Sequence, residues 1–263
     1  MTIFCMAISC IAGFAIPIIL FFYFYKEKDA DILPFFVGCG VMLVFVFVLE
    51  STVHQIVLGS SFGAAIQNNI WLYGFYGGLM AGLFEETGRL LAFKTVLRKR
   101  ADKNIDALMY GAGHGGFEAA MILGLSMLSN ILIAVQINSG NISAITGTLS
   151  GDALAQTEAV VQTLTTTPSY MFLAGILERI FAVILHLALS VLVWFAAKNK
   201  NKMYLYPAAI GIHMLADASA VILNGYSVPV LIIEAIVCMV SLLAAWFAKK
   251  VWTDSTGHQS QTN

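Results

Sequence analysis

The sequence predicts an all-α membrane protein, a single domain built as a bundle of about seven spanning helices. Of its 263 residues, 59% are hydrophobic and only 11% are charged, whereas about 25% of the residues in an ordinary soluble domain are charged. A chain of this composition lacks the polar residues that would cover a water-soluble fold. Its apolar residues also form long runs, each near or above the roughly 20 residues that a spanning helix needs.

Seven such runs define the predicted spans, which are residues 2–25, 33–58, 70–97, 105–136, 169–197, 203–223 and 227–250. The first run has no basic segment ahead of it and is too long for the core of a signal peptide, so we expect it to remain as a spanning helix. We place one transmembrane domain at residues 1–252, with a core at about 70–220. Residues 253–263 are expected to form a polar, disordered tail.

The positions of the basic residues predict the orientation of the chain. Eleven of the 14 Lys and Arg residues fall in four clusters, and each cluster follows an odd-numbered span. The clusters are Lys26 and Lys28; Arg98, Lys99, Arg100 and Lys103; Lys198, Lys200 and Lys202; and Lys249 and Lys250. Because cytoplasmic loops are enriched in Lys and Arg, we expect the N-terminus outside and the C-terminus in the cytoplasm.

The one long loop, residues 137–168, is predicted to face the opposite side. It contains no Lys or Arg and is rich in Ser, Thr, Asn and Gln. Within it, Asp152 is predicted to cap a short interfacial helix that ends before Pro168.

Four of the predicted spans carry an ionisable residue at the same depth. These residues are Glu86, His114, His186 and His213, each 11 or 12 residues from a basic cluster. At 1.5 Å per residue this separation is roughly 17 Å, which is near the middle of a hydrocarbon core about 30 Å thick. An ionisable group at that depth costs at least ~2.5 to 3.5 kcal/mol. We therefore expect the four side chains to face one another inside the bundle.

The same spans carry further polar residues at helical spacing. Side chains three, four or seven positions apart lie on one face of a helix. Such pairs are Glu85 with Arg89, His114 with Glu118, His213 with Asp217, and Arg179 with His186. Gly74, Gly78 and Gly82 lie on one face with Glu86, a pattern that lets another helix backbone approach closely. His54, near the outer end of the second span, is interpreted as an interfacial residue without a partner at helical spacing.

These side chains favour hydrolysis of a peptide bond. A buried glutamate beside Arg89 can stay ionised and still take a proton from water, which makes it a general base. Histidines can position that water or donate hydrogen bonds to the oxyanion that forms when it attacks a carbonyl. The same residues could hold a metal, although the zinc motif HExxH is absent. We expect that no cofactor is required and that zinc is possible, with His114, His186, His213 and Glu118 as its candidate ligands.

Four motifs, in this order, resemble the YhfC family of intramembrane proteases. They are EETGR, DALMYGAGHGGFEAA, ERIFAVILH and HMLAD, and they cover about residues 80–220. That family is similar to PrsW and to the superfamily of CAAX prenyl proteases and bacteriocin-processing enzymes. The resemblance implies that Glu85 or Glu86 activates the hydrolytic water and that a histidine assists.

Further roles follow from the same resemblance. His213 and Asp217 occupy the place of the His-xxx-Asn motif of CAAX proteases, whose side chains stabilise the oxyanion. The sequence leaves open whether Asp217 is protonated or orients His213, and whether His114 or His186 assists the glutamate. We expect catalytic roles for Glu85, Glu86, His114, His186 and His213, and supporting roles for Arg89, Glu118, Arg179 and Asp217.

The leading hypothesis is a glutamate-dependent intramembrane endopeptidase that cleaves membrane-anchored peptides. A proton- or ion-coupled transporter would use the same polar layer as a proton relay, although the sequence has no sign of inverted repeats. A catalytically silent scaffold would bind other membrane proteins through the same cavity. No basic patch indicates nucleic acid. The expected partners are the lipid bilayer and a membrane protein or peptide substrate, and the expected location is a bacterial plasma membrane.

Overall fold

All regular structure in the described part of the chain is helical. The structure is a computed structural model that describes residues 2–100 and 103–257. Elements labelled η are π-helical turns (η1, η2 and η4) or short 3₁₀ turns (η3, η5 and η6). The elements are α1 (Thr2–Phe22), η1 (Tyr23–Glu27), α2 (Leu33–Val41), η2 (Met42–Glu50), α3 (Ser51–Leu58), α4 (Gly63–Gln67), α5 (Ile70–Lys94), η3 (Arg98–Arg100), α6 (Asp106–Ala119), η4 (Ala120–Leu125), α7 (Ser126–Asn138), α8 (Ser143–Thr146), α9 (Gly151–Thr166), η5 (Ser169–Leu173), α10 (Ala174–Lys198), η6 (Lys200–Lys202), α11 (Leu205–Gly225) and α12 (Val230–Gly257).

Several of these elements join into longer helices. Six helices among the described residues are long and apolar enough to cross a membrane. They are Thr2–Glu27, Leu33–Leu58, Asp106–Asn138, Ser169–Lys198, Lys200–Gly225 and Val230–Gly257. The predicted all-α, multi-pass membrane bundle is therefore confirmed.

Helix α5 corresponds to the predicted third span but is not one of these six. Its 25 residues are enough to cross a membrane, but Glu85, Glu86 and Arg89 interrupt its apolar run. The count of seven spans, which includes α5, stays a prediction, as does the orientation of the termini.

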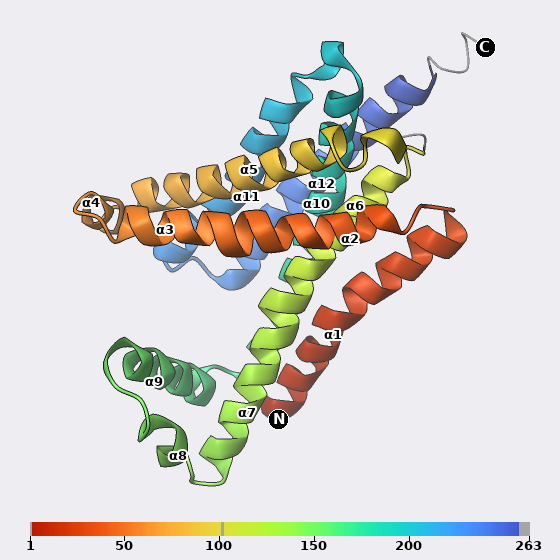
Figure 1. Cartoon of the computed structure of the whole chain (residues 1–263). Helices are drawn as coiled ribbons and strands as arrows, with labels where there is room; N and C mark the ends of the chain where they lie inside the picture. Colours follow the sequence, from red (N-terminus) through yellow and green to blue (C-terminus); the bar gives the residue numbers. More distant parts are fainter. Residues whose placement is uncertain (1, 101–102, 258–263) are drawn as a thin grey trace.

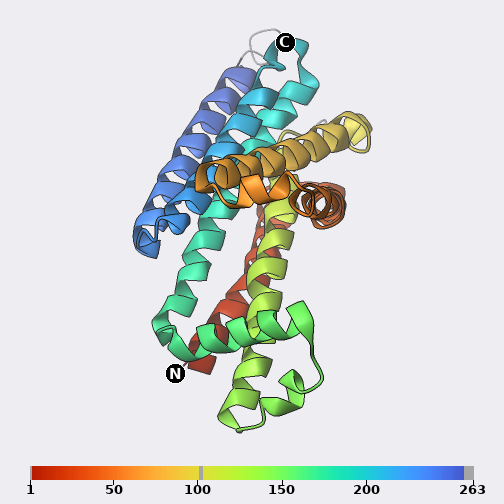
Figure 2. The same cartoon turned by 90° about the vertical axis from the view of Figure 1, so that its left-hand side faces the viewer.

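Helix α10 lies at the centre of the bundle. In its most apolar stretch 67% of the residues are buried inside the protein, against 17 to 33% in the other five candidate spans. It packs against α6, α11 and α12, while α5 packs along α11 and α2 packs along α6. Figures 1 and 2 show α10, α11 and α12 side by side, with α5 and the α2–α3 helix lying across one face. Polar side chains on the inner faces of these helices are therefore shielded from lipid.

The glycine stripe of α5, which was predicted to let another helix approach closely, is the surface on which α11 packs. A β-carbon at Gly78 would lie 2.6 Å from the carbonyl oxygen of Met214, and one at Gly82 would lie 2.8 Å from that of Ile210. Carbon and oxygen atoms cannot approach this closely, so these positions require glycine. The close contact brings the polar faces of α5 and α11 together.

Glycines also let α6 contact two neighbouring helices at short distance. A β-carbon at Gly113 would lie 2.0 Å from the carbonyl oxygen of Phe35 in α2. On another face of the same helix, a β-carbon at Gly111 would lie 3.0 Å from the α-carbon of Leu187 in α10. His114 directly follows Gly113, and its side chain is fully buried.

The four basic clusters follow helix ends that share one side of the molecule. Figure 1 shows the C-terminal ends of α1, α5, α10 and α12 toward the upper right, opposite the N-terminus and α8–α9. This arrangement is the one that the predicted topology requires.

Two local features differ from the sequence prediction. The helix predicted in the long loop is α9, but it begins at Gly151, so Ser150 holds the N-cap position and Asp152 lies in the first turn. The C-terminal helix α12 continues to Gly257, and the hydroxyl groups of Thr253 and Ser255 donate hydrogen bonds to the carbonyl groups of Lys249 and Val251 in the preceding turn. Residues 253–257 are therefore helical where a disordered tail was predicted, and residues 258–263 of that tail lie outside the described residues.

Candidate functional site

Three histidines surround Glu85 at the centre of the bundle. Glu85 Oε2 lies 2.8 Å from His114 Nε2 and 3.7 Å from His186 Nδ1, and Glu85 Oε1 lies 3.7 Å from His213 Nε2. The ring centres of His114 and His186 are 5.1 Å apart, and those of His186 and His213 are 5.4 Å apart. All four side chains are buried. Helices α5, α6, α10 and α11 thus bring the predicted polar layer together as one cluster.

Glu86 has different partners from Glu85. It is fully buried and forms an ion pair with Arg89, one turn further along α5. Its other oxygen, Oε1, accepts a hydrogen bond of 2.8 Å from Nδ1 of His213. The i,i+4 spacing suggested that Arg89 would pair with Glu85, but its guanidinium instead contacts Glu86 and, at 3.3 Å, His186 Nδ1. Glu86 therefore compensates the buried charge of Arg89 and orients the ring of His213.

A second carboxylate–arginine pair holds His186 from the other side. Glu118 Oε1 accepts a hydrogen bond of 2.6 Å from Arg179 Nη1, and Glu118 Oε2 accepts one of 2.8 Å from His186 Nε2. Because Nε2 donates this proton, the neutral ring has its lone pair on Nδ1, which faces Glu85. Glu118 was predicted to lie on one face with His114, but its carboxylate reaches across to α10.

A cavity of about 400 Å³ connects part of this cluster to the space between α10, α11 and α12. Glu85, His186 and His213 line the cavity, whereas Glu86, Arg89 and His114 are not among its lining residues. Only some of the five predicted catalytic residues can therefore meet a molecule that enters by this route. Glu85 is the member of the glutamate pair that reaches it.

Asp217 lies in the wall of the same cavity, one turn beyond His213 on α11. Its Oδ2 is 3.5 Å from His213 Nε2, and 41% of its side chain is exposed. The 3.7 Å between His213 Nε2 and Glu85 Oε1 is too long for a direct hydrogen bond. A water molecule within hydrogen-bond reach of both atoms would therefore lie beside this pair and not between its members.

Glu85, His114 and His186 also have the geometry of a metal site. One ligand atom from each residue lies within 4.8 Å of the others, and two histidines with a glutamate are a common zinc donor set. Glu118 holds the far nitrogen of His186, as carboxylates do behind metal-binding histidines. Nδ1 of His114 is buried without a partner among the described residues.

The donor set that the structure assembles differs from the set expected from the sequence. His213 and Glu118 were expected as ligands beside His114 and His186, but neither belongs to this group. Glu118 bonds to the other nitrogen of His186, and Glu85 takes its place. The residues present fit a metal ion, provided that Arg89 turns away from His186 Nδ1.

The sequence analysis missed a second polar cluster beside the site. His54 has a partner at helical spacing after all, because its Nε2 lies 3.1 Å from Oε1 of Glu50, four residues earlier. Its Nδ1 lies 2.9 Å from the hydroxyl group of Tyr76 in α5. Glu50 is buried and within electrostatic range of Glu85 and Asp217. The i,i+4 spacing of Glu50 and His54 in the sequence could have indicated this pair.

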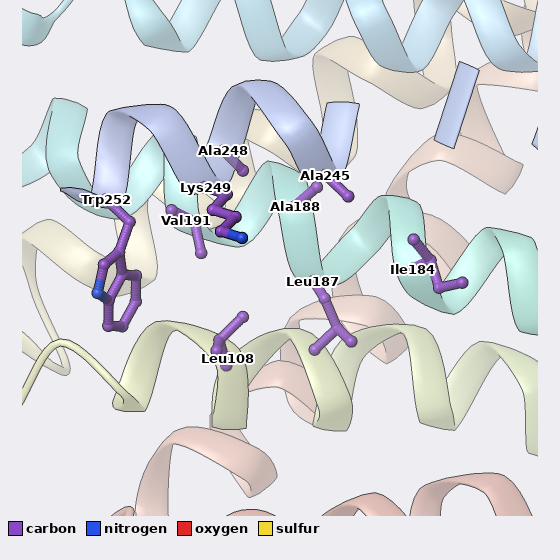
Figure 3. A pocket seen from close by; sticks show the side chains of 9 residues that line it. All are labelled: Leu108, Ile184, Leu187, Ala188, Val191, Ala245, Ala248, Lys249 and Trp252. Carbon is purple, nitrogen blue, oxygen red and sulfur yellow. The ribbon is translucent and has the colours of Figure 1, made fainter. Parts of the chain in front are cut away.

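A second cavity, of about 290 Å³, has no comparable chemistry. It lies between α6, α10 and α12, and Figure 3 shows the nine side chains that line it. Lys249 is its one ionisable residue, and the other eight are apolar or, like Trp252, aromatic. The polar cluster around Glu85 is therefore the better candidate for an active site.

A membrane helix bundle with buried glutamates and histidines at the end of a cavity is compatible with the class of intramembrane hydrolases. The comparisons with known proteins agree with this class. The family model described as "YhfC intramembrane metalloprotease" matches residues 12–241. The chain is also 36% identical, over 93% of its length and 94% of the relative's, to a Bacillus subtilis (strain 168) protein named "Uncharacterized membrane protein YhfC". No solved structure matches the chain.

The match to the family model spans well over half of the chain, so the chain belongs to the YhfC intramembrane metalloprotease family. The resemblance found in the four sequence motifs is thereby confirmed. The protein is a multi-pass membrane protein and, at the level that the family defines, an intramembrane protease.

Proposed function

We propose that this protein is an endopeptidase that cleaves membrane-anchored peptides and that Glu85 activates the hydrolytic water. The observation that carries the proposal is the position of Glu85, which contacts the histidine cluster and lines the cavity. Glu86 has both oxygens engaged by Arg89 and His213. Of the two adjacent glutamates, Glu85 is therefore the one that a substrate and a water molecule can reach.

In the proposed reaction the water lies on the cavity side of Glu85 Oε1 and His213 Nε2, which are 3.7 Å apart, and is within reach of both atoms. Glu85 takes a proton from the water molecule while the water oxygen attacks the peptide carbonyl carbon. The carbonyl oxygen then becomes an oxyanion. The same carboxyl group then gives the proton to the departing amine as the C–N bond breaks. The peptide bond is hydrolysed and Glu85 returns to its ionised form.

In this proposal His213 stabilises the oxyanion. Glu86 accepts the Nδ1 proton, so Nε2 points toward Glu85 and the cavity. When Nε2 is protonated, it can donate a hydrogen bond to the oxyanion. Asp217, at 3.5 Å from the same nitrogen, favours that protonated form. In this proposal Glu86 and Asp217 are positioning residues for His213.

The other two histidines are proposed to position Glu85 and to hold the metal that the family description implies. His114 bonds directly to Glu85, and Glu118 orients His186. A metal ion held by Glu85, His114 and His186 would act as a Lewis acid and lower the pKa of a bound water molecule.

Peptide cleavage per folded molecule tests the proposal. Glu85→Gln should abolish cleavage, because an amide cannot accept the proton. His213→Ala and the Glu85→Gln/His213→Ala double variant should fall to a similar residual rate, since residues that act as a unit are strongly non-additive. Losses that follow only the loss of folded protein would mean that these side chains are structural. Proton flux without cleavage would instead support a transporter.

Metal content and peptide cleavage can be measured independently on the same preparations. Elemental analysis of the purified protein should find a bound divalent metal that is lost in His114→Ala, and chelation should lower cleavage. Full cleavage after complete removal of the metal would contradict the metal-assisted form and leave Glu85 as the base alone.

A further inference from the structure

Glu234 of α12 lines the cavity beside Glu85 but has no ion-pair partner among the described residues. Its side chain is buried, with a residue exposure of 7%, and its Oε2 has no hydrogen-bond partner among the described residues. It forms no ion pair with any residue that the structure describes. A buried carboxylate without a partner is costly, and its position in the cavity wall suggests that its partner is a ligand.

The cavity as a whole has an excess of acidic groups. Five carboxylates line it, and Arg179 is its one arginine or lysine. Arg179 is already paired with Glu118 and Glu178. Arg179 is within electrostatic range of Glu234, but its one charge is shared with two other carboxylates, so the part of the cavity next to α12 keeps an excess of acidic groups.

Apart from Asn224, the wall of the cavity between its charged groups and histidines is apolar, and several of its side chains are small. Ala216, Ala220 and Val221 of α11 and Ile233 and Val237 of α12 lie in it. Small side chains leave room for an extended peptide, and an apolar wall suits the methylene stem of a long basic side chain, whose charged end then reaches a polar group. Glu234 is the group in this wall that could receive such an end.

We propose that Glu234 recognises a lysine or arginine side chain of the substrate peptide, next to the bond that Glu85 hydrolyses. The substrate class is then a membrane-anchored peptide with a basic residue close to its cleavage site. This inference rests on the proposed peptidase function, and it adds a specificity-determining residue that touches the substrate away from the reacting atoms.

Peptide binding to the full-length protein in detergent tests the inference separately from cleavage. The probes are fluorescent apolar peptides of about 20 residues that differ only in one residue, Lys, Gln or Glu, moved through successive central positions. Binding is measured by fluorescence anisotropy in the Glu85→Gln background, where cleavage does not consume the probe. At the best position, the Lys peptide should bind about tenfold more tightly than the Gln peptide, a difference in binding free energy of about 1.4 kcal/mol.

Three substitutions at one position, with one control, make the test specific. Glu234→Gln should bring the Lys-to-Gln affinity ratio close to one, and Glu234→Lys should favour the Glu peptide. Glu234→Gln should remain folded, because neutralising an unpaired buried charge removes a cost instead of adding one, and Glu234→Leu gives a second charge-free variant. Glu158→Gln, on the exposed surface of α9, should leave the ratio unchanged.

The outcomes separate this inference from the proposed function. An unchanged ratio in Glu234→Gln, or no preference for Lys at any position in the parent, would overturn the inference even if every peptide is cleaved by the wild-type chain. A charge preference that depends on Glu234 but occurs without cleavage by the wild-type chain would support the binding site and contradict the peptidase.

Discussion

Glu85 and Glu86 are adjacent in sequence, yet their side chains meet different surroundings. Glu85 faces three histidines and the cavity, while Glu86 is enclosed between Arg89 and His213. Consecutive residues of a helix project about 100° apart, so the two carboxylates can serve neighbouring helices. One glutamate of the adjacent pair thus lines the cavity, and the other is paired with Arg89 and His213 behind it.

The Glu86–Arg89 pair should dominate the local stability. Arg89→Gln is expected to lower the free energy of unfolding by about 3–5 kcal/mol, because it leaves Glu86 as an unpaired buried charge. Adding Glu86→Gln should recover part of this loss. Denaturant unfolding in mixed micelles measures both values. As a control, Lys103→Gln, which removes an exposed ion pair with Asp29, should change stability little. Additive losses of stability in the Glu86 and Arg89 variants would contradict the coupling between these two residues.

Glu118 should matter through His186. Glu118→Ala removes the acceptor that orients this ring, and loss of such a partner typically weakens metal binding about 10- to 100-fold. Competition with a chelator of known affinity measures the change. As a control, Asp217→Ala, on the cavity side of His213, should retain the metal. Equal losses of metal affinity in Glu118→Ala and Asp217→Ala would argue against the donor set of Glu85, His114 and His186.

At the scale of the helices, glycine contacts decide which polar faces meet. Gly78 of α5 lies against the backbone of Met214, the residue that follows His213 in α11. The distance between these two helices therefore fixes how far His213 lies from Glu86. Packing between apolar faces and the chemistry of the site are coupled at this one contact.

The contact can be tested with neighbouring glycines of one helix. Gly78→Ala should push α11 away and lower both stability and peptide cleavage, because its β-carbon would lie 2.6 Å from the carbonyl oxygen of Met214. At Gly77 a β-carbon meets nothing within 4 Å, so Gly77→Ala should be neutral or stabilise by about 0.5–1 kcal/mol. Thermal stability and cleavage are measured on the same samples. Equal effects of the two variants would show that the approach of α11 is not limiting.

The depth of the polar residues could be predicted from the sequence, but their pairing could not. Rise per residue is constant in a helix, so counting from basic clusters placed Glu86, His114, His186 and His213 in one layer. Partners depend instead on which helices are neighbours and how each is rotated. Glu118 therefore pairs with residues of α10, which its own helix does not reveal. The role of each site residue likewise stays a prediction.

At the scale of the whole molecule, the basic helix ends lie on one side, and the long loop with α8 and α9 lies on the other (Figure 1). The cavity lies between α10, α11 and α12 and includes Asn224 and Val230, at the turn that connects α11 to α12. This turn is on the side without basic clusters. In the predicted topology a substrate therefore reaches the site from the outer half of the bilayer.

Reporter fusions test this topology directly. Fusions at Lys28 and Lys200 should report the cytoplasm, and a fusion at Asn141 should report the outside, because Lys and Arg are retained on the cytoplasmic side. Activity of a compartment-specific enzyme reporter provides the measurement. A cytoplasmic signal at Asn141 would contradict the seven-span arrangement and the outer entrance to the cavity.

The Glu86–Arg89 pair also bears on how the protein is made. Because both residues belong to α5, their charges can neutralise each other while this helix enters the bilayer, before any later helix has been synthesised. Glu85 meets its histidines only when α6, α10 and α11 have followed. The proposed hydrolytic centre would therefore be completed late in biosynthesis, and a nascent chain that has inserted only its first helices would lack it.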